Sequence, residues 1–190
     1  MMSEIIRNAI KAKLETVITA EVGKVHAHER YSKSHNELKE LFTLDKVICG
    51  FFIRRVRRQE TIYTSTRNKV ATTWEIRGYA SFIDEEQSEI KFDNLIDDVA
   101  ISFRNDNTLG GIVENLGDDA TGIQLEDSGP VLFASILCHG VRLSLTTNHY
   151  EEISDQTDEL QDFNSANVKW DIPPHNPEII DAVDNINLEE

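Results

Sequence analysis

The sequence predicts an α+β fold: a mainly antiparallel sheet with a long hairpin, packed against two amphipathic helices and followed by an extended acidic C-terminal arm. Apolar residues recur at spacings of three and four in segments 3–20 and 86–105, as on one face of a helix. They alternate with polar residues in 46–83 and 131–147, as in half-buried strands. Acidic residues and prolines concentrate in 150–190, which is typical of an arm without its own core.

Residues 3–20 are predicted to form the first helix, with Ser3 as its N-cap and Glu4 placed favourably for the helix dipole. Its apolar face is formed by residues three or four positions apart: Ile6, Ile10, Leu14, Val17 and Ile18. A short strand is expected over 24–31, followed by a helical turn or a loop over 34–42.

Residues 46–58 and 70–83 are rich in β-branched and aromatic residues, and a polar turn is expected between them at 64–69. In the first strand, alternation predicts one face with Val47, Cys49, Phe51 and Ile53 and another with Ile48, Phe52 and Val56. In the second strand, one face carries Trp74, Ile76, Gly78, Ala80 and Phe82. We therefore expect a long antiparallel hairpin, half buried, over 46–83.

The second helix is predicted over 86–105, with an apolar stripe formed by Phe92, Leu95, Ile96, Val99 and Phe103. Residues 112–116 and 119–127 are expected to form a weaker strand pair, followed by a long strand over 131–147 with a β-bulge near His139–Gly140. The predicted core between the sheet and this helix consists of Trp74, Phe82, Phe92, Leu95, Val99, Phe103, Leu143 and Leu145.

The chain has 190 residues and a formal net charge of −15, which is distributed unevenly. Residues 1–149 have a net charge of −4, whereas residues 150–190 have a net charge of −11. We therefore divide the chain into an α+β core domain over 1–149 and an acidic, proline-containing arm over 150–190. Phosphates would repel a chain of this charge, which excludes a general basic surface for duplex DNA.

The cysteines, the apolar runs and the N-terminal residues indicate where in the cell the protein is expected. Cys49 and Cys138 do not make a disulfide framework, so a reducing cytosol is the expected site of synthesis and assembly. No apolar run reaches the length of about 18 residues that indicates a membrane span. The first residues lack the apolar core and the small-residue cleavage site of a secretory signal, so none is expected.

The segment 46–83 has a net charge of +6 and contains a short run of arginines, Arg54, Arg55, Arg57 and Arg58. Simple alternation predicts that Arg55 and Arg57 face opposite to Arg54 and Arg58. One of these pairs is predicted to lie at an interface with another subunit or a neighbouring protein, because complementary charge sets register and partner choice. The alternative is a solvated strand face with local carboxylate partners.

The arm is predicted to bind an adjacent subunit or a neighbouring ring through separate apolar anchors. The candidate anchors are Trp170, Ile179 and Ile180, and Trp170 is expected to matter most because buried aromatic residues tend to dominate interfaces. Pro173-Pro174 favours an extended path. The alternative is a disordered acidic tail that keeps the protein soluble before assembly.

Motifs for catalysis are missing: the sequence contains no P-loop, GxGxxG, CxxC, HExxH or GxSxG pattern. The best metal candidates are His26 and His28, which would point to one side of a strand, with His139 or Glu21 as a third ligand. A zinc site needs three or four converging ligands, and the spacing supplies only two. We therefore predict a protein that is not an enzyme, with no catalytic residues, no metal and no cofactor.

The order of elements resembles the tail terminator (tail completion) proteins of long-tailed bacteriophages over residues 1–149. The resemblance rests on an N-terminal helix IIRNAIKAKLETVI, a strand KVHAHERYS, a long strand WEIRGYASFID, a helix FDNLIDDVAISFRNDNTLGG and a final strand region VLFASILCHGVRLSLTT. It carries no catalytic signature.

The resemblance implies a hexameric ring at the tail-neck junction of the virion, assembled in the host cytoplasm. Such a ring caps the tail tube, stops its polymerisation and joins the tail to the head-neck complex. The implied partners are further copies of the chain, tail tube subunits with or without sheath subunits, and a head completion protein, while the genome passes through the lumen without specific binding. Two alternatives remain open: another neck or connector component such as a stopper or adaptor, and a metal-dependent hydrolase that uses His26 and His28.

Overall fold

The computed structural model describes most of the chain in segments: 2–30, 34–44, 47–82, 87–117, 122–153 and, for the backbone, 165–170 and 182–187. The chain divides into two compact units, Met1–Ile153 and Ser154–Glu190, and each is treated by itself.

The first unit is an α+β domain, as the sequence predicts. Its described elements are α1 (Met2–Glu15), β1 (Lys24–His26), α2 (His35–Phe42), β2 (Thr43–Leu44), β3 (Val47–Ile62), β4 (Arg67–Ser81), α3 (Ser88–Asn105), β5 (Asn115–Leu116), β6 (Ile123–Phe133) and β7 (Ile136–Glu152). Strands β1, β3, β4 and β7 lie side by side in this order; β2 pairs with β3, and both β5 and β6 pair with β7. The sheet is mainly antiparallel, because only the short pair β1–β3 is parallel.

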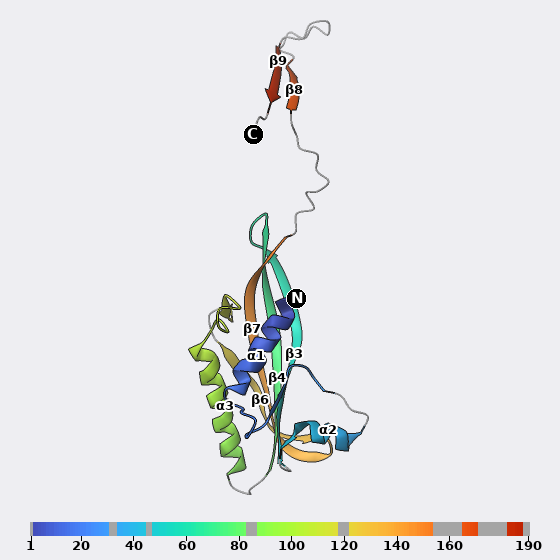
Figure 1. Cartoon of the computed structure of the whole chain (residues 1–190), viewed down its shortest axis with the longest axis vertical. Helices are drawn as coiled ribbons and strands as arrows, with labels where there is room; N and C mark the ends of the chain where they lie inside the picture. The colour runs from blue at the N-terminus through green and yellow to red at the C-terminus, as the bar shows by residue number, and fades with distance from the viewer. Residues whose placement is uncertain are drawn as a thin grey trace. The chain divides into compact units, whose positions relative to one another are not determined.

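Helices α1 and α3 pack on the same face of the sheet (Figure 1). The predicted apolar face of the first helix is confirmed for Ile6, Ile10 and Leu14, which are 0% exposed. The helix ends at Glu15, so the predicted end at residue 20 is wrong: Val17 and Ile18 follow the helix, Ile18 buried and Val17 partly buried. The helix begins at Met2, so Ser3 lies inside it and the predicted N-cap is wrong. The Ser3 hydroxyl instead accepts a hydrogen bond from Arg55 at 3.2 Å.

The apolar stripe of α3 is buried against the sheet through Phe92, Ile96, Val99 and Phe103. Trp74, Leu143 and Leu145 are buried in the same cluster, as predicted, and Leu95 is only partly buried at its border. The prediction is wrong for Phe82, which follows the end of β4 and is 46% exposed. The strand ends at Ser81, one residue before alternation would have carried Phe82 into the core.

A smaller apolar cluster covers one end of the opposite face of the sheet. It is centred on α2, which the sequence left open as a helical turn or a loop and which begins at a Ser34 N-cap. Its buried members are Phe42, Ile48, Phe52, Phe133 and Cys138. Phe42 contacts Phe133 edge to face, with ring centroids 4.9 Å apart. The two faces of the first predicted strand are therefore both used, one toward α1 and α3 and the other toward α2.

The predicted long hairpin is confirmed as β3–β4, and its turn end extends past the N-terminus of α1 (Figure 1). The register between the two strands shifts between Arg55 and Arg57, so a β-bulge lies at Val56. A bulge inserts one residue and reverses the alternation beyond it. Val56 is accordingly 55% exposed instead of packed on the second face.

The third strand region differs from its prediction. Residues 131–147 are not one strand but a second hairpin, β6–β7, whose turn residues Ala134 and Ser135 have positive φ angles of 48° and 66°. The pairing of β4 with β7 runs without a register shift past His139 and Gly140, so the bulge predicted there is wrong. A bulge lies in β6 instead, between Leu125 and Asp127.

The expected pairing of 112–116 with 119–127 is also wrong, because β5 and β6 both pair with β7. β5 pairs with Asn148 and Thr147 of β7, and β6 pairs with the β7 residues from Leu145 back to Ile136. The two strands therefore follow one another along the same edge of β7.

In the second unit, the backbone of β8 (Ser165–Trp170) pairs antiparallel with β9 (Ala182–Asn187). Trp170 is the last residue of β8, and its side chain lies outside the described part of the chain. Ile179 and Ile180, the other predicted anchors, also lie outside the described residues. The docking role predicted for the arm stays a prediction.

Candidate interaction surface

The arginine run lies on the outer half of β3, and the bulge at Val56 decides which way each side chain faces. Arg55 pairs with Trp74 of β4 and Arg58 pairs with Thr72, so both arginines share the helix-covered face. Arg54 and Arg57 therefore share the opposite face. The predicted grouping, in which Arg54 went with Arg58 and Arg55 with Arg57, is wrong because it assumed unbroken alternation.

Two of the four arginines have carboxylate partners within the chain. Arg54 contacts Glu75 at 2.9 Å and Glu29 at 3.9 Å. Arg58 contacts Glu60 at 2.7 Å and reaches Glu151 on β7, two strands away. These contacts match the alternative prediction of local ion pairs for these two residues.

The other two arginines have only neutral hydrogen-bond acceptors among the described residues: Arg55 donates to Ser3, and Arg57 donates to Gln59 at 3.1 Å. Both are exposed. They are the members of the run that remain available to a partner.

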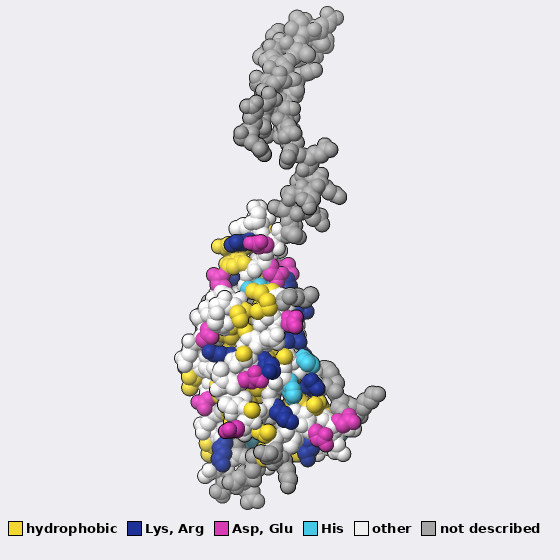
Figure 2. Space-filling model, in the orientation of Figure 1, with side chains coloured by type: hydrophobic (Ala, Val, Ile, Leu, Met, Phe, Trp, Pro, Cys, Tyr) yellow, Lys and Arg dark blue, Asp and Glu magenta, His cyan; other side chains and the backbone are white. Residues whose placement is uncertain are grey.

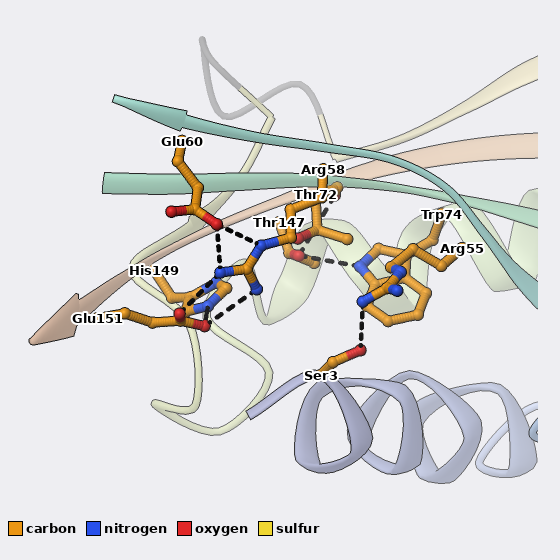
Figure 3. Close-up of polar contacts among 9 residues, drawn as sticks. All are labelled: Ser3, Arg55, Arg58, Glu60, Thr72, Trp74, Thr147, His149 and Glu151. Carbon is orange, nitrogen blue, oxygen red and sulfur yellow. Dashed lines mark hydrogen bonds and ion pairs between the residues drawn. The ribbon is translucent and has the colours of Figure 1, made fainter. Parts of the chain in front are cut away.

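Arg58, Glu60, His149 and Glu151 form a cluster of polar contacts near one end of the sheet (Figure 3). We call this cluster the brace. Arg58 donates two hydrogen bonds to Glu151, at 2.8 and 3.2 Å, and the buried ring of His149 contacts the same carboxylate at 2.9 Å. These hydrogen bonds, Arg58 first and His149 second, lower the pKa of Glu151 to about 2. The paired carboxylates raise the pKa of Arg58 in turn. The brace ties β3 to β7 across β4, which lies between them.

The pH dependence of this brace gives a first prediction. Because the folded pKa of Glu151 lies below its unfolded value of 4.5, its contribution to stability is complete above pH 4.5 and is lost as the pH falls towards 2. Glu151 and Arg58 are each about one-third exposed, so we expect only about 1 kcal/mol or less after solvent screening. Urea unfolding of Arg58→Met should therefore differ from wild type at pH 7 and converge with it at low pH.

The matched control is Arg57→Met, which removes the same charge one residue from Arg58 on the other face of the hairpin. At protein concentrations at which the chain is monomeric, Arg57 has no carboxylate partner in the described part of the chain, so its stability difference from wild type should not depend on pH in this range. A pH-independent difference for Arg58→Met would show that Glu151 is not held by this arginine.

The face of the sheet away from α1 and α3 has a depression of about 430 Å³ that sequence reasoning missed. Its charged lining residues are Arg77, Asp127 and Arg142, and Tyr79 forms part of its wall. Burial raises the pKa of Tyr79, and Arg77 donates to Glu75 at 2.8 Å. The strands bring Arg77 and Arg142 together although they are 65 positions apart in the chain, which no local motif indicates.

The surface in view mixes the two signs of charge. Figure 2 shows basic and acidic side chains interspersed over the first unit instead of gathered into a patch of one sign. A surface of this kind gives little attraction for a phosphate backbone and suits protein contacts in which single charges choose the register.

The metal candidates do not converge. β1 ends at His26, so His28 lies beyond the strand and the shared strand face predicted for the two rings is wrong. The Nε2 atom of His26 lies 2.9 Å from the Leu41 carbonyl oxygen, and burial lowers the pKa of this histidine. His139 contacts Ser88 of α3 at 3.0 Å and packs against Phe82. It therefore lies on the face covered by α3, whereas His26 lies on the face covered by α2.

Within the described ranges, no group of three or more histidine, cysteine, aspartate or glutamate side chains is placed to hold a metal ion. Cys49 and Cys138 are buried and free, and burial raises the pKa of Cys49 to about 11. The thiols lie in two separate apolar clusters, one on each face of the sheet.

Among the described residues, no helix has both the length and the apolar character that crossing a membrane requires. A scan against protein-family models and a search among curated proteins found no match to this chain.

Proposed function

We propose that this chain is a structural virion protein of the phage tail terminator class. In this proposal it assembles into a hexameric ring that caps the tail tube, stops its polymerisation and joins the tail to the head-neck complex. The ring would contact tail tube subunits, with or without sheath subunits, on one side and a head completion protein on the other. The genome would pass through its lumen without specific binding.

The observation that carries the proposal is a pair of open sheet edges with unlike charge. No strand of the described chain pairs with the outer edge of β3 from Ile53 to Ile62, or with the outer edge of β6. The β3 edge carries the arginine run, whereas the β6 edge carries Glu126 and Asp127. These edges border opposite sides of the sheet.

Two different surfaces of one chain that complement each other give a heterologous, head-to-tail contact. Such contacts close into a ring when the rotation between neighbours allows it and otherwise propagate as a filament. Both edges also contain a β-bulge, a feature that hinders indiscriminate strand pairing and leaves side chains to select the partner. A ring-forming structural protein therefore accounts for the free edges, their charges and their bulges together.

The proposal predicts the state of assembly of the purified chain. Light scattering after gel filtration should give a discrete particle of six chains of 21.6 kDa each, and negative-stain images should show rings. Added to polymerising tail tube protein of the same virion, the ring should shorten the tubes and lie at one end of each.

The two measurements separate the alternatives. Rings that form but leave tube length unchanged would favour a stopper or adaptor at another level of the neck. A chain that stays monomeric, both alone and with tube protein, would contradict the ring altogether.

A further inference from the structure

A groove lies between the first half of α3 and strand β6, separate from the arginine run. Its volume is about 690 Å³. Apolar side chains line it from both elements and from Phe82, which follows β4. Two of the lining residues are open to solvent: Phe82 is 46% and Leu125 is 59% exposed. Apolar area of this kind on a charged protein marks a contact surface.

One wall of the groove is acidic. Glu89, Asp93 and Asp97 follow each other at intervals of four residues along α3, so their carboxylates lie on one side of the helix. None of the three has a cationic partner among the ion pairs of the described residues. A row of like charges at this spacing weakens a helix, and a cation from outside the chain would relieve the repulsion.

The turn end of hairpin β3–β4 has the complementary properties. Tyr63 is 61% exposed and contacts Tyr150 of β7, with ring centroids 4.8 Å apart. Tyr150 pairs with Lys69 in the sheet, and Arg57 lies on that same face. Neither Lys69 nor Arg57 has a carboxylate partner among the ion pairs of the described residues. Lys69 pairs with Thr61, two residues from Tyr63, whereas Arg57 pairs with Thr73, about 13 Å farther along the hairpin. The turn end thus presents an aromatic side chain with one free cation close to it and a second one farther along the same face.

The hairpin end cannot reach the groove of its own chain. The turn lies before Arg67, where β4 begins, whereas the groove runs from the level of Ile76, to which Leu125 is linked through Leu143, as far as Phe82 beyond the other end of β4. About 30 Å of strand therefore separates the turn from the nearest part of the groove. Any contact between these two surfaces must join two copies of the protein.

We propose that the turn end of the β3–β4 hairpin of one copy lies in the α3–β6 groove of the next copy. Tyr63 enters the apolar floor beside Leu125, while Arg57 and Lys69 face the carboxylates of Asp93 and Asp97. The inference rests on the proposed ring and names the contact that holds it. Because hairpin and groove are different surfaces, the contact repeats head to tail.

Charge reversal tests the contact in the full-length chain. Arg57→Glu with Lys69→Glu, and separately Asp93→Lys with Asp97→Lys, should each raise the concentration at which the oligomer dissociates by about tenfold or more. The four substitutions combined in one chain should bring it back to within about threefold of wild type, because the reversed charges again attract. Circular dichroism checks that each variant remains folded.

Asp98→Lys is the matched control for the groove. It makes the same change of charge on α3 but lies on the side of the helix that faces α1, so it should leave assembly unchanged. A loss of assembly as large as that of Asp97→Lys would mean that net charge, not the groove, controls association, and would overturn the inference.

A disulfide trap gives an independent readout. A chain with Tyr63→Cys mixed with a chain with Leu125→Cys should form an intermolecular disulfide under mild oxidation, whereas either chain alone should not. Rings that persist through both charge reversals and give no mixed disulfide would overturn the groove contact and leave the ring proposal standing. A wild-type chain that never assembles would overturn the ring and the contact together.

Discussion

Replacing Trp74 with alanine is expected to lower the free energy of unfolding by about 3–5 kcal/mol, the usual cost of deleting a large buried aromatic side chain. Trp74 is 0% exposed and lies where β4 meets α1, with the guanidinium carbon of Arg7 5.6 Å from the centre of its ring. Its indole N–H donates to Thr147 on β7 at 2.9 Å (Figure 3). The side chain therefore joins the first helix to two central strands.

Urea unfolding monitored by circular dichroism would measure this loss. Trp74→Phe keeps most of the apolar volume and removes the hydrogen bond to Thr147 and part of the ring, so it should cost less than Trp74→Ala. The matched control is Phe82→Ala, an aromatic truncation at a half-exposed site, which should cost about 1 kcal/mol. Equal losses at Trp74 and Phe82 would contradict the placement of the core against α1.

The repeating patterns of the sequence were sufficient for the main elements. A period of 3.6 residues placed α1 and α3, and a period of two placed β3 and β4, because each of these segments is long and buries one face. Patterns of this kind report burial directly. They report nothing on which strands pair, and this is why β5 and β6 were wrongly paired with each other.

The missed turn and the missed bulges have a common physical reason. A two-residue hairpin turn with positive φ angles is normally signalled by asparagine and glycine, but the β6–β7 turn uses Ala134 and Ser135, which carry no such signal. The bulge at Val56 lies within an otherwise regular run, and only the partner strand reveals that one residue is unpaired. Each of these events changes the direction of every side chain beyond it.

Each candidate surface likewise has one part that the sequence could indicate and one part that depends on strand pairing. The arginine run could be read from the sequence because its residues are neighbours, but its partner Glu151 lies 93 positions from Arg58 and is supplied by the sheet. The groove could have been suspected from the spacing of Glu89, Asp93 and Asp97, which is visible along the chain. Its apolar floor could not, since Leu125 reaches it only through the pairing of β6 with β7.

Close packing between β3 and β4 gives the last prediction. Gly78 lies directly opposite Phe51, whose ring covers it so closely that an added Cβ would overlap ring atom Cε1. Phe51 is 0% exposed and stacks on Phe92 of α3, so a shift of its ring would disturb the packing of the core. Gly78→Ala should therefore lower the free energy of unfolding by about 1–3 kcal/mol, although alanine is otherwise the better residue in a strand.

The control for this substitution is Gly129→Ala on β6, where an added Cβ has no atom within 4 Å. That change should be neutral or stabilise by up to about 1 kcal/mol, because it reduces only the freedom of the unfolded chain. In a double-mutant cycle, Phe51→Leu should cost less in the Gly78→Ala background than in wild type, since the smaller side chain relieves the overlap. Additive losses would show that the ring of Phe51 does not pack on Gly78.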